Sequence, residues 1–204
     1  MRNSSVALAT YFRRLVTPPV PGDGLLLAGF VEGVIGWGLS WVFATSPGLA
    51  PLGPITSIVG LWLVLTIGIV AIGIVYTAPT VRRNRVWIVW GVLNLAATVV
   101  NLAAVAGALP LEWLRYAYWH PWFAVIGAGY VVTAVDNWGS PQLRYQERLV
   151  YGISGVATLG LLGLTVASPT VLFGAQVFLI GGVIQLVPIG HDVLADAVLI
   201  ARRH

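Results

Sequence analysis

Six long apolar segments constrain the fold of this chain more than any other feature. Hydrophobic residues make up 58% of the 204 residues and charged residues only 9%, against about 25% charged residues in a typical soluble domain. A helix needs about 20 mostly apolar residues to cross the hydrocarbon core, and the alternating pattern of a membrane β-barrel is missing. The sequence therefore predicts an all-α fold, a polytopic transmembrane helical bundle of six spans. The expected spans are residues 25–45, 55–77, 86–109, 117–135, 149–167 and 171–189.

The positions of the arginines predict how this bundle is oriented. The eleven basic residues are all arginine, and all but Arg115 lie before the first span, after an even-numbered span or at the C-terminus. Cytoplasmic loops are enriched in Lys and Arg, so we expect three hairpins in the cell membrane, with both termini cytoplasmic. Residues 1–24 are then a cytoplasmic segment, residues 25–190 the transmembrane domain and residues 191–204 a cytoplasmic tail. The mixed polar and apolar pattern of the tail predicts a short helix at the interface.

Composition and spacing also exclude several kinds of site. The chain has no Cys, which removes disulfides and thiolate ligands, and no Lys, which removes a retinal Schiff base. Phosphate loops, dinucleotide fingerprints and zinc motifs are absent from the sequence, and topology explains its basic charge better than nucleic acid does. His120 and His191 fall on opposite sides of the predicted membrane, which disfavours haem between two histidines. We expect no metal, no cofactor and no nucleic-acid partner.

A single carboxyl group inside a predicted span is the strongest functional signal. Glu32 lies in the first span, on the cytoplasmic side of its middle. A charge at membrane depth costs about 2.5–3.5 kcal/mol on insertion scales and marks function by default. Gly29, Gly33 and Gly36 surround Glu32 on the helix surface, so we expect this face to pack closely against another helix. Glu32 is then either a structural carboxyl, hydrogen-bonded to a neighbouring helix, or a ligand for an ion, a proton or a substrate.

The third span continues this polar seam. Asn94 and Asn101 are seven residues apart and therefore share one helix face. Hydrogen bonding between helices is the alternative role for such amides. Further polar residues come from the cytoplasmic half of the later spans, and we expect them to converge on the same cavity. The residues expected to line a solute, ion or proton path are Glu32, Asn94, Asn101, Tyr130, Ser154 and Gln185.

Aromatic residues gather near the ends of the spans and predict two interfacial belts. Trp119, His120 and Trp122 form an expected outer rim, in which His120 is either an interfacial residue or a ligand gate, a proton uptake point or a quinone contact. The outer belt comprises Trp37, Trp41, Trp113, Tyr116, Tyr118, Trp119 and Trp122, and the inner belt Trp87, Trp90 and Trp138.

One short motif suggests hydrolysis. Gly152-Ile-Ser154-Gly155 matches the G-x-S-G of rhomboid intramembrane proteases. Those enzymes pair the serine with a histidine two helices later, whereas here the next histidine, His191, follows the last span. An intramembrane hydrolase is therefore the third alternative, and an enzyme is not the expected class.

The last third of the chain is a Gly-rich hairpin with a proline at its tip. It runs from Tyr151 through Ser168-Pro169 to Gly181, Gly182 and Gln185. In this stretch the chain resembles the HdeD-like family of small six-span membrane proteins, although the Trp-rich middle of the chain and Glu32 depart from it. The resemblance implies the six-span fold and a link to acid-stress tolerance without a defined reaction.

These patterns predict an integral membrane protein that moves or binds a small solute, ion or proton through the seam at Glu32 and Asn94. The first alternative is a non-transporting anchor, or a subunit that binds lipid, quinone or carotenoid within a larger complex. The expected partners are the lipid bilayer and a small solute or lipophilic ligand. A homo-oligomer or a larger membrane complex stays open.

Overall fold

The part of the chain that the structure describes is built from helices. The computed structural model describes residues 2–136, 143–168 and 174–202, and β structure within them is confined to one bridge between Val20 and Thr77. The bridge ties the segment before α2 to the end of α3. The predicted all-α class is therefore confirmed for these residues.

Five helices in the described ranges are long and apolar enough to cross a membrane. They are α2 (Gly22–Thr45), α3 (Pro54–Ala71, extended by a π-helical turn over Ile72–Tyr76), α5 (Arg85–Val105), α8 (Tyr145–Ala167) and α9 (Gln176–Arg202). The remaining predicted span coincides with α7 (His120–Asp136), whose 17 residues cover about 25 Å, less than the roughly 30 Å of hydrocarbon. The short helices are α1 (Arg2–Val16), α4 (Pro79–Arg82) and α6 (Leu111–Leu114), with a 3-10 turn over Pro47–Leu49.

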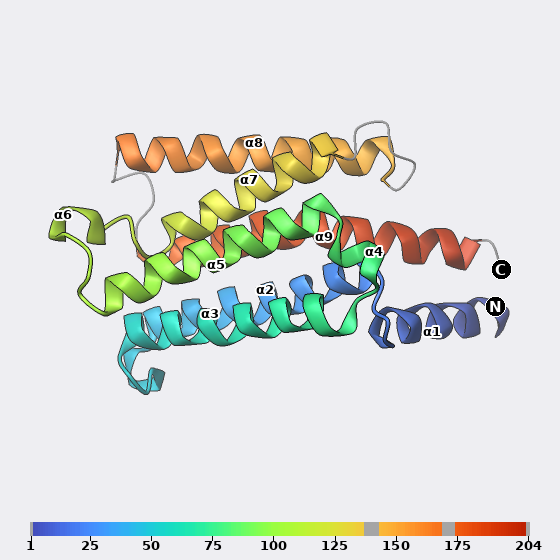
Figure 1. The fold of residues 1–204 in the computed structure, drawn as a ribbon, viewed down its shortest axis with the longest axis horizontal. Helices are drawn as coiled ribbons and strands as arrows, with labels where there is room; N and C mark the ends of the chain where they lie inside the picture. Colours follow the sequence, from blue (N-terminus) through green and yellow to red (C-terminus); the bar gives the residue numbers. More distant parts are fainter. Residues whose placement is uncertain (1, 137–142, 169–173, 203–204) are drawn as a thin grey trace.

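Neighbouring long helices run antiparallel (Figure 1). Helix α2 packs against α3 and α9, α5 packs against α3 and α7, and α7 packs along α8, whereas the contact between α8 and α9 is slight. The α7–α8 contact is close because a Cβ at Gly155 would lie 2.8 Å from the backbone nitrogen of Val131. Small residues allow such close approach of helix backbones in membranes. Helix α8 therefore lies at one edge of the bundle, against the outer side of α7.

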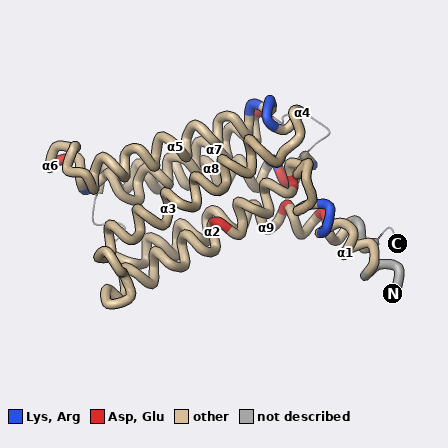
Figure 2. Tube along the Cα trace, turned by 60° about the horizontal axis from the view of Figure 1, so that its bottom comes forward, with Lys and Arg blue, Asp and Glu red and all other residues tan. Residues whose placement is uncertain are grey.

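Charged residues gather at one end of the bundle. Basic residues cluster where α1 and α4 lie, whereas α6 lies at the opposite end (Figure 2). We call these the arginine end and the α6 end. At the arginine end, the side chain of Asn84 accepts a hydrogen bond from the backbone N–H of Val86 at 2.9 Å and so caps the start of α5.

Both ends of the chain differ from the prediction. Residues 2–16 form α1, an unanticipated helix whose Leu15 is buried. The predicted separate tail helix is wrong, because α9 continues through Pro188 to Arg202. Neighbouring helices and local adjustment make proline tolerable in membrane helices, and beyond it Val193 and Ala197 stay buried while α9 packs against α1. The predicted start of the last span at residue 171 and residues 203–204 lie outside the described ranges.

Tryptophans join the helices in a repeated way. Trp37 of α2 packs over Gly181 of α9 and donates its indole N–H to Gln185 Oε1 at 2.6 Å. The glycine gives room for the ring, and the polar residue one turn later satisfies the N–H. The same arrangement joins α3 to α2 through Trp62, Gly36 and Ser40 (3.0 Å), and α5 to α7 through Trp90, Gly129 and Thr133 (3.1 Å).

This packing corrects the predicted aromatic belts. Trp37 and Trp122 are only 3% and 4% exposed, and each donates a hydrogen bond to another helix. They belong to the core rather than to an interface with lipid head groups. Trp113, by contrast, is exposed, and Trp138 lies outside the described residues.

Candidate functional site

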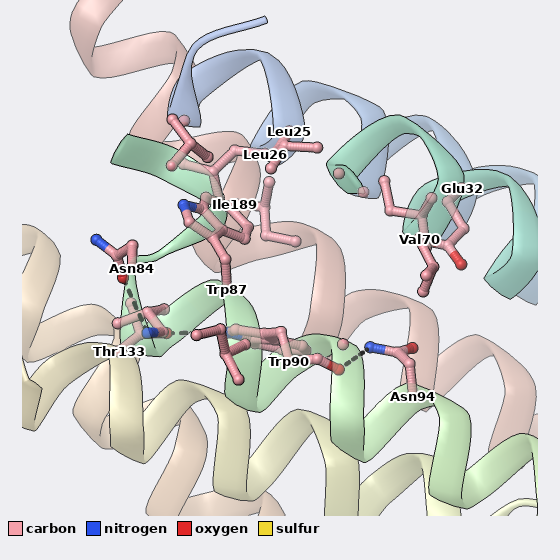
Figure 3. Close-up of a pocket in the computed structure, with 18 of the residues that line it drawn as sticks. Leu25, Leu26, Glu32, Val70, Asn84, Trp87, Trp90, Asn94, Thr133 and Ile189 are labelled. Carbon is pink, nitrogen blue, oxygen red and sulfur yellow. Dashed lines mark hydrogen bonds between the residues drawn. The ribbon is translucent and has the colours of Figure 1, made fainter. Parts of the chain in front are cut away.

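A cavity of about 430 Å³ opens among α2, α3, α5, α7, α8 and α9 in the half of the bundle near the arginine end. Its walls are mostly aliphatic and aromatic, and a few polar side chains project from different helices (Figure 3). Pockets of this size and composition are typical small-molecule sites. Four predicted path residues line it: Glu32, Asn94, Tyr130 and Gln185.

Glu32 and Asn94 lie on facing walls of this cavity, one from α2 and the other from α5 (Figure 3). The predicted close packing beside Glu32 is observed at Gly33, where a Cβ would lie 3.0 Å from Leu186 of α9. Glu32 Oε1 is buried, yet no described residue hydrogen-bonds to it. A purely structural Glu32 would be hydrogen-bonded to a neighbouring helix, and its Oε1 has no such bond among the described residues.

Asn94 is available to a ligand in a way that Asn101 is not. Asn94 Nδ2 donates to the backbone oxygen of Trp90 at 2.8 Å, within its own helix, so this bond does not join two helices. Thr98 bonds both its own helix, at Asn94 O (2.9 Å), and α3, at Thr66 Oγ1 (3.2 Å). The link between α5 and α3 is thus made by the hydroxyl groups, and Asn94 borders the cavity.

Tyr130 and Gln185 hold the wall of the cavity together. Tyr130 is 1% exposed, and its hydroxyl donates to the backbone oxygen of Gln185. Gln185 in turn accepts the indole N–H of Trp37. Both side chains are committed to contacts between helices, so their first role is to position the walls rather than to contact a solute.

Ser154 and Asn101 do not join this cavity. Ser154 is half-buried on α8 and does not line the cavity, although Tyr151 of the same helix does. The Ser154 hydroxyl has no described hydrogen bond to His191. The predicted convergence is therefore wrong for Ser154. Asn101 faces a second cavity of about 180 Å³ toward the α6 end, where its side-chain nitrogen donates to Ala117 O and, at 2.8 Å, to Tyr118 O.

The predicted outer rim is split between core and surface. Trp122 is buried and donates its indole N–H to Asn101 Oδ1 at 2.7 Å, so its placement on a rim is wrong. Trp119 and His120 are half-buried and stacked, with ring centroids 3.7 Å apart. His120 Nδ1 is buried and has no hydrogen bond to any described residue.

Several lining residues escaped the sequence analysis. Asp23 and Asp192 line the cavity, although the sequence analysis assigned both to cytoplasmic segments outside the membrane. Arg82 of α4 also lines it. Asp192 is 5% exposed and accepts a hydrogen bond from Tyr151 Oη at 2.9 Å. A signal existed for Asp192, because it lies seven residues after Gln185 and shares its face if the helix continues past Pro188.

Titratable groups from α1, α8 and α9 lie close together at the arginine end. Burial, followed by the nearby Asp23 and Asp196 carboxylates, raises the pKa of Tyr11 in α1 to about 12. The hydrogen bond to buried Glu147 raises the pKa of Arg144 above its ordinary value, and Arg144 also pairs with Asp196 at 3.0 Å. Several carboxylates and arginines therefore lie close together beside the cavity.

Comparison with known proteins adds no relative from which to transfer a function. No protein-family model, curated protein or solved structure matches the chain. The resemblance to the HdeD-like family stays a prediction from its residues. Within the described ranges, no group of three or more His, Cys, Asp or Glu residues is placed to hold a metal ion.

Proposed function

We propose that the protein spans the membrane six times, with both termini in the cytoplasm, and moves a small solute, ion or proton through the cavity at Glu32. Support for the topology comes from five long apolar helices and from the clustering of arginine at one end (Figure 2). Helix α7, short but central, is the sixth span. Contacts with α5 and α8 cover most of the surface of α7. Because little of this helix faces lipid, its length need not equal the thickness of the hydrocarbon core.

The observation that carries the function is a buried Glu32 oxygen that receives no hydrogen bond from the described residues and lies in a cavity opposite Asn94. A carboxyl at membrane depth that serves only structure is expected to find a hydrogen-bond partner, since an unpaired buried polar group is costly. A ligand, a proton or an ion supplies that partner. Asn94, whose only described side-chain bond lies within its own helix, can complete the site.

Aromatic rings close the path toward the α6 end. Trp62 lies between Trp37 and Trp122, with ring centroids at 5.0 and 4.5 Å, and Phe123 contacts Trp37 at 6.2 Å. The larger cavity instead reaches Asp23 and the exposed Arg82 at the arginine end. With arginines facing the cytoplasm, this arrangement corresponds to the inward-facing state of a carrier. The aromatic side chains that close the α6 end then have to rearrange before a solute is released on the outer side.

Replacing Glu32 tests this proposal directly. Purified protein is reconstituted into vesicles, and protons driven by an imposed potential are followed with an internal pH dye. We expect flux above that of protein-free vesicles, and a return to that baseline in Glu32→Gln, because the amide cannot take up and release the proton. Glu112→Gln, which changes an exposed glutamate on α6, is the control and should leave flux unchanged.

Two outcomes would count against transport. Equal flux in Glu32→Gln and the unmodified protein removes the central role of Glu32. Absence of flux in both removes proton movement and favours the alternative, a membrane protein that binds a ligand without moving it.

Cysteine labelling tests the topology. The chain has no Cys, so Thr80→Cys in α4 and Glu112→Cys in α6 each introduce a unique thiol at an exposed position near opposite ends of the bundle. In intact cells, a membrane-impermeant maleimide should label Glu112→Cys alone, and Thr80→Cys only after permeabilisation. Labelling of both positions in intact cells, or the reverse order, contradicts the six-span orientation.

A further inference from the structure

The larger cavity opens sideways between α3 and α5. Ile74, Ile88, Val92 and Leu95 all line it, yet they are 46–61% exposed on the outer surface. The cavity and the outside therefore meet between these side chains. All four are aliphatic and belong to helices long enough to span the bilayer. In the proposed six-span arrangement, the medium at this opening is therefore hydrocarbon rather than water.

The opening coincides with an irregularity of α3. The helix widens into a π turn over Ile72–Tyr76, and Arg82 Nη1 donates to the backbone oxygen of Ile74 at 2.9 Å. Such π turns occur frequently at functional sites. Here the turn places Gly73 and Ile74 at the edge of the cavity, so the change in helix geometry and the opening belong to one feature.

The polar groups inside favour a cation. Among the described lining residues, the carboxylates are those of Asp23, Glu32 and Asp192, whereas Arg82 is the single guanidinium. Arg82 is exposed at the arginine end, so its charge is screened by solvent more than the buried carboxylates are. A positively charged ligand gains from this imbalance, and an anion of the same size does not.

An aromatic wall lies across the cavity from Glu32. Trp90 packs edge-on against Tyr130 at 5.3 Å between ring centroids, and Tyr130 packs against Tyr151 at 5.2 Å. All three rings and Trp87 line the cavity. Aromatic faces attract organic cations, more strongly when the site is desolvated. The half-buried rings of Trp87 and Trp90 and the Glu32 carboxyl therefore offer a cation two kinds of stabilisation at once, with the buried tyrosine rings packed behind Trp90.

We propose that the ligand is an organic cation with an apolar body, which reaches the cavity from the bilayer through the opening between α3 and α5. Its charge lies between Glu32 and the aromatic wall, and its apolar body contacts the aliphatic side chains of α3 and α5. This inference rests on the proposed function, because it names the class of solute that the same cavity takes.

Two probes of matched shape and opposite charge test the inference. Purified protein in detergent is equilibrated with tetraphenylphosphonium or with tetraphenylborate, and bound probe is measured by dialysis. We expect saturable binding of the cation and binding of the anion weaker by about ten-fold or more, the order expected from one charge pair in a partly desolvated site. Glu32→Gln should weaken cation binding by a similar factor, whereas Glu32→Asp, which keeps a carboxyl group, should retain most of it.

A second pair of variants tests the route. Val92→Trp fills the opening from its rim, whereas Val64→Trp adds the same ring to an exposed part of α3 that does not line the cavity. In reconstituted vesicles, Val92→Trp should slow loading of the cation and Val64→Trp should not. Circular dichroism and elution volume confirm that both variants are folded.

The outcomes separate this inference from the proposed function. Equal binding of the two probes, unchanged cation affinity in Glu32→Gln, or equal loading rates in the two tryptophan variants overturns the inference, while proton flux through Glu32 would still stand. Saturable, Glu32-dependent binding of the cation without proton flux supports the inference and removes transport of protons.

Discussion

Replacing Gly36 with valine should strongly destabilise the bundle. A Cβ at this position would lie 2.7 Å from the Trp62 ring, which is held between Trp37 and Trp122 and bonded to Ser40. Overpacking a core costs about 1–3 kcal/mol, and an indole N–H left unpaired in the core costs a similar amount. We expect the free energy of unfolding, measured by SDS titration of the detergent-solubilised protein, to fall by about 2–5 kcal/mol.

Gly38 offers a matched control on the same helix. It lies two residues further along α2, is exposed, and no described atom lies within 4 Å of a Cβ built there. Gly38→Val should therefore change the free energy of unfolding by less than about 0.5 kcal/mol. Equal destabilisation by the two substitutions would mean that loss of glycine in α2, rather than contact with Trp62, controls stability.

The positions of the long helices could be predicted from apolar length. Apolar length placed the starts of the second and third spans at residues 55 and 86, each one residue from the observed start of α3 or α5. The proline at the start of α3 and the Asn84 cap of α5 are local signals that agree with these starts. The end of α9 could not be predicted in this way, because Pro188 is a stop signal in an isolated helix and only the packing of α9 against α1 shows why the helix continues.

The candidate site was predictable in part. Glu32 and Asn94 face one cavity because both are polar residues at similar depth on helices that lie on opposite sides of it. Ser154 has comparable polarity and depth, but it lies on a face of α8 that does not line the cavity, unlike Tyr151 one turn earlier. Which side of α8 faces inward depends on the contact at Gly155, and a chain with many glycines does not identify that contact by sequence alone.

The tryptophans show why interfacial and core aromatic residues are hard to separate. An indole has an apolar body and one N–H, so it suits the membrane interface and also a core position with an acceptor. A distinguishing signal is present, since Gly36 and Ser40, Gly129 and Thr133, and Gly181 and Gln185 are each four residues apart. With that spacing, the glycine leaves space for the indole ring and the polar residue four positions later accepts its N–H.

Replacing Asn101 with leucine should also destabilise the protein, because this amide joins three parts of the α6 end. Its Nδ2 donates to Ala117 O and Tyr118 O, and its Oδ1 accepts from Trp122 Nε1 at 2.7 Å. Leucine fills a similar volume but leaves the indole N–H without its acceptor and two backbone oxygens without this donor. We expect the free energy of unfolding, from the same SDS titration, to fall by about 2–4 kcal/mol.

Asn94→Leu is the matched control. Asn94 lies seven residues earlier on the same face of α5, and the substitution removes only a hydrogen bond within the helix, to Trp90 O. We expect a change of less than about 0.5 kcal/mol in stability and, because Asn94 borders the larger cavity, a clear loss of ligand binding. Asn101→Leu should leave binding per folded molecule intact. If the two variants lost stability equally, the two asparagines would form one structural seam, and Asn94 would not be a residue reserved for a ligand.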